Sequence, residues 1–179
     1  MKIILVMVLL VSIETILVVN RVNNNWSYNM DKSEDGTLTL QEYLPYKLST
    51  LANRLSQSLA DKYSKQFGIS VAEWRVIAVL GENQRATAKE ITLTIAMDKV
   101  KVSRTVKKLI IKQLVKTNTV TNDNRSQTIQ LTPEGSSLYS SLVPIALNHQ
   151  QLALQNFTDK DIVKLNKLLA KLDQNITNL

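Results

Sequence analysis

The sequence predicts a mainly α-helical fold with a single small β-hairpin, and three observations point to it. The 179 residues include only four glycines and three prolines, so few positions interrupt a helix. Over most of the chain, apolar residues recur at steps of three and four, which is the period of an amphipathic helix. The exception surrounds Asn122-Asp123-Asn124, where β-branched segments flank residues that favour turns.

The first 29 residues are set apart by composition as an apolar leader. Residues 3–19 are mostly apolar and long enough to span or nearly span a bilayer, although Glu14 near their middle costs roughly 2–3 kcal/mol on insertion scales. They lack the small-x-small cleavage site of a signal peptide. Because Met30 opens a polar lead into a helix, we expect residues 1–29 to be an over-extended start of a cytoplasmic protein. The alternative is a membrane anchor.

Residues 30–69 are expected to contain one long helix, from Leu40 to Phe67. Pro45 falls in its first turn, where proline costs least, and Gly68 is expected to end it. The apolar stripe of this helix consists of Leu44, Leu48, Leu51, Leu55 and Leu59. Because such a stripe has little of its own domain to bury against, we expect a partner chain to cover it.

Two helices follow, each opened by a capping box, in which a Ser or Thr and a Glu three positions later satisfy the free N–H groups. Ser70 and Glu73 open the first, and Gly81 is expected to end it. Thr87 and Glu90 open the second, which is short. The expected buried side of the first helix comprises Trp74, Ile77, Ala78 and Leu80.

The next helix is strongly basic on one side. Asp98 is placed to cap it, and from Lys99 to Arg125 the chain carries eight basic residues and one acid. At 100° per residue, one side gathers Val102, Thr105, Val106, Leu109 and Gln113. The opposite side carries Val100, Ser103, Arg104 and Lys107, flanked by Lys101 and Lys108. A charge run is most often a solvated helix face, but such a surface also suits a polyanion.

Residues 117–121 and 126–131 are expected to form a hairpin after this helix. The order of elements is then short helix, tight connection, basic helix and two-stranded wing. A winged helix-turn-helix has this order. We therefore expect residues 70–132 to form a DNA-binding domain of that fold.

Four segments resemble the multiple antibiotic resistance regulator (MarR) family of bacterial winged-helix repressors, and their order and spacing make the resemblance specific. They are FGISVAEWRVIAVL, MDKVKVSRTVKKL, DNRS and QLTPEG. The resemblance covers about residues 40–179 and none of the first 30. In one departure, many members of the family have Gly-Leu where this chain has Gln113-Leu114, directly after the basic helix.

The resemblance implies roles for individual residues. The stretch from Lys99 to Val115 would lie along the major groove of DNA. Arg125 would enter the minor groove from the tip of the wing, and Asp123 would hold that arginine or brace the wing. The residues implied to contact DNA are Lys99, Val100, Ser103, Arg104, Lys107, Lys108 and Arg125.

Residues 133–179 are expected to form C-terminal dimerisation helices. Thr132 and Pro133 open the first of them, and both helices carry apolar stripes. Thr158 opens the second with a capping box in which Asp161 takes the place of Glu. The resemblance implies that these helices and the helix of residues 30–69 join two chains in a two-fold dimer. Such a homodimer would place two basic helices about one turn of DNA apart, as a palindromic operator requires.

The resemblance also implies a small effector, often aromatic or anionic, that binds between the dimerisation and reading regions and changes the spacing of the reading helices. The candidate residues for its pocket are Tyr43, Tyr46, Trp74 and Arg75. The alternative role for these aromatic residues is plain core packing. The function implied is that of a ligand-responsive repressor of transcription.

No catalytic, metal or cofactor site is expected. The chain has no cysteine, which removes thiolate zinc sites, and its one histidine, His149, has no spaced acidic partner for a catalytic triad. The four glycines are expected at turns or helix ends and not in a phosphate-binding loop. The protein is therefore not expected to be an enzyme.

The net charge of +7 favours nucleic acid or an anionic membrane surface as the partner. Two alternatives to a DNA reader stay open. One is a membrane-anchored protein whose basic face binds anionic lipid, and the other is a winged-helix module that binds protein. A DNA reader should lose affinity with salt but keep a preferred sequence, whereas a lipid binder should sediment with vesicles and show no such preference.

Overall fold

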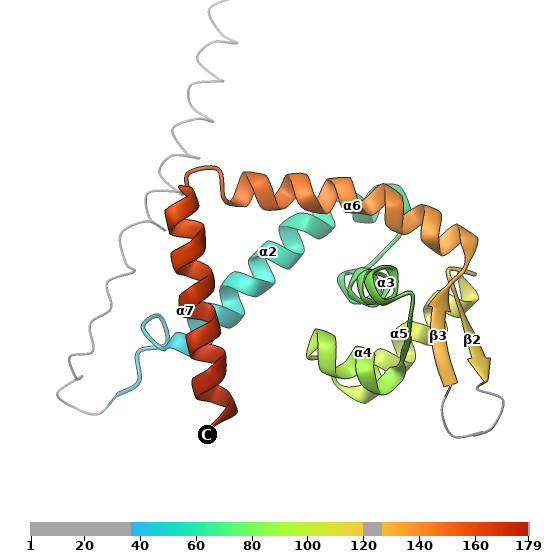
Figure 1. Cartoon of the computed structure of the whole chain (residues 1–179), viewed down its shortest axis with the longest axis horizontal. Coiled ribbons are helices and arrows are strands. Elements are labelled where there is room, and N and C mark those ends of the chain that lie inside the picture. The colour runs from blue at the N-terminus through green and yellow to red at the C-terminus, as the bar shows by residue number, and fades with distance from the viewer. Residues whose placement is uncertain (1–36, 120–126, 179) are drawn as a thin grey trace, which may run out of the picture. The chain divides into compact units, whose positions relative to one another are not determined.

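The computed structural model describes residues 37–119 and 127–178 and confirms the expected class, a mainly helical chain with one small sheet (Figure 1). The chain divides into two compact units, residues 1–54 and 55–179. The elements are α2 (Leu44–Phe67), α3 (Val71–Asn83), β1 (Arg85–Thr87), α4 (Ala88–Ile95), α5 (Lys99–Ile111), β2 (Val115–Thr119), β3 (Gln127–Leu131), α6 (Pro133–Ala153) and α7 (Asp159–Thr177). The apolar leader lies outside the described residues.

Helix α2 begins at Leu44 rather than at Leu40. Pro45 explains the difference, because proline has no N–H to donate and its ring would clash with the carbonyl of a preceding helical turn. A helix containing Pro45 is therefore favoured to start beside it. The helix ends as expected at Gly68, whose φ of +63° lies in the left-handed region that glycine adopts at low cost.

Helix α3 continues through Gly81 to Asn83, so the prediction that Gly81 ends it is wrong. A Cβ atom at Gly81 would lie 2.5 Å from the ring of Tyr139, which belongs to α6. The glycine is therefore required for close packing of two helices. At the other end of α3, the capping box of Ser70 and Glu73 is present as expected, and Thr87 and Glu90 form another on α4.

The sheet has three antiparallel strands in the order β1-β3-β2. The hairpin of β2 and β3 was expected, but β1 was not, because three residues are too short for an alternating pattern to identify a strand. Arg85 of β1 pairs with Gln130, and Val115 of β2 pairs with Leu131. The central strand β3 thus joins the segment before α4 to the segment after α5.

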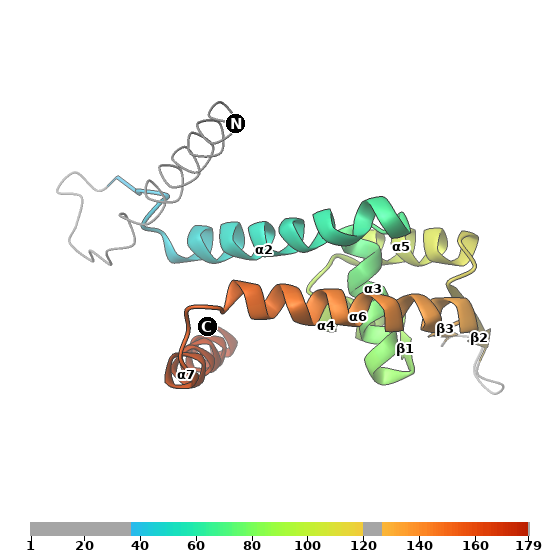
Figure 2. The same ribbon diagram turned by 90° about the horizontal axis from the view of Figure 1, so that it is seen from above.

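The core gathers around α3, which lies between α6 on one side and the pair α4 and α5 on the other (Figure 1). Figure 2 shows the start of α6 beside the strands. Ile77 and Leu80 are buried as expected, whereas Trp74 and Ala78 are only partly buried. The largest fully buried side chains are Tyr63, Ile69, Ile77, Leu80, Ile91, Leu109, Leu142, Val76 and Val102.

The last helix, α7, contributes nothing to this core. It begins with a capping box between Thr158 and Asp161, and none of its residues is buried in the single chain. No helix within residues 37–119 and 127–178 has both the length and the apolar character needed to cross a membrane.

Candidate nucleic-acid interface

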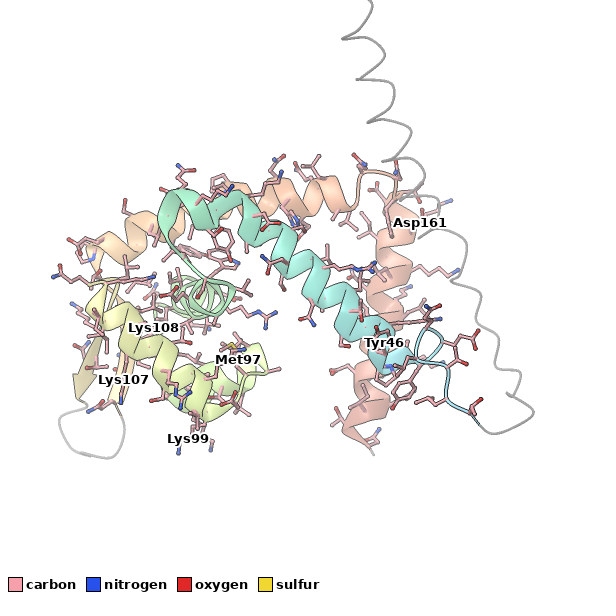
Figure 3. All side chains as sticks on the ribbon, turned by 180° about the vertical axis from the view of Figure 1, so that it is seen from behind. Tyr46, Met97, Lys99, Lys107, Lys108 and Asp161 are labelled. Carbon is pink, nitrogen blue, oxygen red and sulfur yellow. The ribbon has the colours of Figure 1, made fainter. Side chains whose placement is uncertain are left out.

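Helix α5 has one buried side and one exposed basic side. Val102, Thr105, Val106 and Leu109 are buried, as the helical spacing predicts. All the predicted contact residues on this helix are exposed, namely Lys99, Val100, Ser103, Arg104, Lys107 and Lys108. Figure 3 shows Lys99, Lys107 and Lys108 along α5. The exposed side is therefore a cationic surface that a neighbouring polyanion could contact.

Both ends of α5 are fixed by local hydrogen bonds. At the start, the carboxylate of Asp98 accepts a hydrogen bond of 2.8 Å from the N–H of Lys101. At the end, the N–H of Leu114 reaches the carbonyl of Leu109 and the N–H of Gln113 reaches that of Ile110, which is the Schellman pattern. Gln113 therefore lies outside the helix, with a φ of +59°, and not on its buried face as the spacing predicts.

A groove of about 360 Å³ separates the N-terminus of α3 from the exposed side of α5. Lys101, Arg104 and Lys108 line it from α5. Lys101 is not among the predicted contact residues, although its position one helical turn before Arg104 indicates the same surface. Ser70, Ala72 and Glu73 line the opposite side.

The most buried charge beside this surface is the carboxylate of Glu73, whose side chain is 5% exposed. One of its oxygens, Oε2, accepts the N–H of Ser70 at 2.8 Å, and the other, Oε1, lies 2.7 Å from the ammonium of Lys112. Burial acts to raise the pKa of Glu73, but the hydrogen bonds from Lys112 and Ser70 outweigh it and lower the pKa below its ordinary value. Neither the burial nor the ion pair is predicted from the sequence.

The predicted wing residues Asp123 and Arg125 lie outside the described residues. The two strands that lead to them are described, and Lys116 on β2 is exposed like the basic side of α5.

The four candidate effector residues have different environments. Trp74 is partly buried, with its ring centroid 6.2 Å from that of Tyr63 and 6.3 Å from that of Tyr139. Arg75 donates a hydrogen bond of 3.0 Å to the hydroxyl of Ser56. Tyr43 and Tyr46, which belong to the unit of residues 1–54, are 45% and 43% exposed.

Two further polar side chains are Tyr63, whose ring lies beside that of Trp74, and His149 on α6. Burial raises the pKa of Tyr63 to about 12, and its hydroxyl has no hydrogen-bond partner among the described residues. His149 lies 2.8 Å from the hydroxyl of Ser58, Nε2 to Oγ. The part of the chain that the structure describes has no group of three or more His, Cys, Asp or Glu residues that could hold a metal ion.

Comparison with known proteins points to one family, both from the sequence and from the fold. The sequence profile of the MarR family matches residues 67–126. A MarR/EmrR family transcriptional regulator from Acinetobacter sp. ADP1 is 30% identical, with a TM-score of 0.73 over 79% of this chain and 100% of that one. The comparison with curated proteins found no match.

Two further solved structures share the fold. A MarR family regulator from Silicibacter pomeroyi is 24% identical, with a TM-score of 0.64 over 79% of this chain and 92% of that one. A MarR family regulator from Listeria monocytogenes, solved in complex with a 26mer DNA, is 20% identical, with a TM-score of 0.70 over 76% of this chain and 90% of that one. The chain has a winged helix-turn-helix, and it aligns with the whole length of the Acinetobacter regulator at 30% identity. It therefore belongs to the MarR family of transcriptional regulators.

Proposed function

We propose that this protein is a cytoplasmic, ligand-responsive repressor that binds a palindromic DNA operator as a homodimer. The observation that carries the proposal is the exposed basic side of α5, opposite a fully packed side. Salt-dependent contacts with phosphates supply affinity in such proteins, and contacts with base edges supply specificity.

In the proposed complex, α5 lies in the major groove. Val100, Ser103 and Arg104 are then the side chains nearest the base edges, and the lysines of the same face contact the flanking phosphates. Arg125 enters the minor groove, and Asp123 supports it. The Listeria monocytogenes relative bound to a 26mer DNA supports this choice of polyanion.

Exposed apolar side chains support the proposed homodimer. On α2, Leu48, Leu51 and Leu55 are between 36% and 43% exposed in the single chain. On α7, four large apolar residues that share one side of the helix are at least 37% exposed, namely Leu165, Leu168, Leu169 and Ile176. Apolar surface on this scale is typical of an interface, so we propose residues 30–69 and 133–179 as dimerisation regions flanking a reading domain of residues 70–132.

The proposed effector site includes Trp74 and Arg75, with Tyr43 and Tyr46 as further candidates. The partly buried ring of Trp74 and the guanidinium of Arg75 suit an aromatic or anionic molecule. Such a molecule changes DNA affinity only by binding one arrangement of the dimer more tightly than another, typically by about 1–3 kcal/mol.

The test is selection of bound fragments from random DNA duplexes with the full chain. We expect an inverted repeat whose affinity falls steeply as salt is raised. Recovery of no enriched motif would overturn the proposal. Sedimentation with anionic vesicles in a parallel experiment would then favour lipid as the partner, and absence of both would favour a protein partner.

A further inference from the structure

One side chain joins three segments of the chain at the end of α5. The ammonium of Lys112 lies 2.7 Å from Oε1 of Glu73 and donates a hydrogen bond of 2.8 Å to the carbonyl oxygen of Gly68. Lys112 is the C-cap of α5, Glu73 lies in the first turn of α3, and Gly68 follows the last residue of α2. We refer to these three residues as the clasp.

We propose that Lys112 is a positioning residue, which fixes the reading helix α5 relative to the end of α2 through the clasp. The inference rests on the proposed function, because α5 is the helix that would enter DNA and α2 is a proposed dimerisation helix. The inference adds to the proposed function a residue that affects which half-site spacing the protein prefers, although its side chain does not contact DNA.

The burial of Glu73 explains why Lys112 stays in the clasp. Oε2 of the carboxylate already accepts the N–H of Ser70, so Oε1 depends on the ammonium for its partner. A buried carboxylate that loses its cation is costly, because its surroundings solvate the unpaired charge poorly. Rotation of Lys112 into solvent is therefore unfavourable.

The same geometry argues against Lys112 as a phosphate contact. A lysine ammonium has three N–H donors, and Glu73 and Gly68 engage two of them. A phosphate would have to compete with both. Lys108 lies on the preceding turn of α5, where it is exposed and predicted to contact DNA, so it provides a matched control.

The consequence concerns the distance between the two reading helices of the proposed dimer. A palindromic operator requires that distance to match the spacing of its half-sites. With the clasp intact, each α5 is held against its own α2, so one spacing is preferred. With the clasp broken, α5 should sample more positions and the preference should weaken.

The first experiment measures the position of α5 without DNA. Since the sequence contains no cysteine, Lys62→Cys on α2 and Lys107→Cys on α5 give two unique sites for nitroxide labels. The labelled full chain, diluted with unlabelled chain, should give one narrow distance distribution by pulsed electron resonance. We expect Lys112→Met and Glu73→Gln each to broaden or shift it, and Lys108→Met to leave it unchanged.

The second experiment measures operator preference. Variants are tested on duplexes from the selection whose half-sites are moved apart or together by single base pairs. Breaking the clasp should reduce the parent's preference for its best spacing by about fivefold, within the usual range of coupling between sites. A protein that was only less stable would lose affinity equally at every spacing.

Charge alone predicts different results. Glu73→Gln removes a negative charge near the DNA, so simple electrostatics predicts tighter binding, whereas the clasp predicts weaker discrimination of spacing. If Lys112 contacted phosphate, Lys112→Met would lower the salt slope by about 1.8, which is about 0.9 for each chain of the dimer. We expect that change for Lys108→Met but not for Lys112→Met.

A double variant keeps the inference testable if Lys112→Met fails to fold. Glu73→Gln with Lys112→Met leaves no buried charge unpaired, so it should fold and still lack the clasp. An unchanged label distance and an unchanged spacing preference in that protein would overturn the inference. Absence of any enriched DNA motif would overturn the proposed function instead, and the label distances would still decide whether the clasp positions α5.

Discussion

At the scale of single residues, Glu73 shows how one carboxylate serves two elements. Oε2 caps α3 through Ser70, and Oε1 holds Lys112 at the end of α5. The helix cap is predictable from the sequence because its residues are three positions apart. The ion pair is not, because it depends on how α5 packs against α3, and the Gly68 carbonyl that completes the clasp lies 44 positions before Lys112.

The lowered pKa of Glu73 makes a prediction about stability and pH. Its folded-state pKa lies below the ordinary value of 4.5, so its ionised carboxylate stabilises the fold above that pH and ceases to do so as the pH falls through the lower value. Each unit of the difference corresponds to about 1.4 kcal/mol. Urea unfolding of the parent and Glu73→Gln, from about pH 7 to about pH 3, should show the parent's advantage shrinking with acid. A gap that widened with acid would contradict this.

Val100 is 58% exposed on the basic side of α5, and an apolar side chain there suits the methyl group of thymine. Replacing one half-site thymine with deoxyuridine removes only that methyl. We expect the replacement to weaken binding of the parent about fourfold, as for one buried methylene, and to affect Val100→Ala less. Val163→Ala, on α7 and 52% exposed, is the control. Equal losses in all three proteins, measured by fluorescence anisotropy for each thymine in turn, would remove Val100 from the base-reading surface.

At the scale of elements, the C-terminus of α5 has a backbone conformation that glycine usually adopts, but the residue at this position is Gln113. Gln113 adopts a φ of +59° in a Schellman motif, and a side chain in this region costs roughly 1–2 kcal/mol. We therefore expect Gln113→Gly to raise the free energy of unfolding by about 1 kcal/mol, measured by urea denaturation. Gln113→Ala removes the same side-chain atoms except Cβ, which causes the strain, so it should bring no such gain. Equal effects of the two substitutions would mean that the backbone at this position is not strained.

The sequence predicts best those helix starts that have a capping box, whereas the start of α2 lies at Leu44 and not at Leu40. The boxes at Ser70, Thr87 and Thr158 depend on residues three positions apart, and all three are present. The role of Gly81 depends on Tyr139, which a local pattern cannot include. Strand β1 likewise depends on pairing with β3, far along the chain. The role of Gly81 and the existence of β1 were therefore missed because tertiary packing decides both.

The same distinction applies to the candidate site. The exposed and buried sides of α5 follow from the helical period, so Val102 and Leu109 on one side and Arg104 and Lys107 on the other are predictable. The role of Lys112 in the clasp can be recognised only from the fold, because in the sequence Lys112 is one of several basic residues near the end of this helix.

At the scale of the whole molecule, the proposed homodimer depends on side chains that the single chain leaves exposed. Leu169 on α7 is 46% exposed and is not among the core residues of the part of the chain that the structure describes, so Leu169→Glu should leave the helical content unchanged. It should nevertheless weaken association, because it places a charge in apolar contact surface. We expect sedimentation equilibrium to show a larger monomer fraction and operator affinity to fall at least about tenfold at low protein concentration.

Gln174→Glu is the matched control, since it adds the same charge on the opposite side of α7. It should associate and bind DNA like the parent. Raising the protein concentration should restore operator binding to Leu169→Glu, because mass action opposes a weakened dimer but cannot repair a damaged reading helix. A variant that stayed dimeric yet lost DNA binding would show that α7 affects the reading domain directly, and the dimer interface would then have to lie elsewhere.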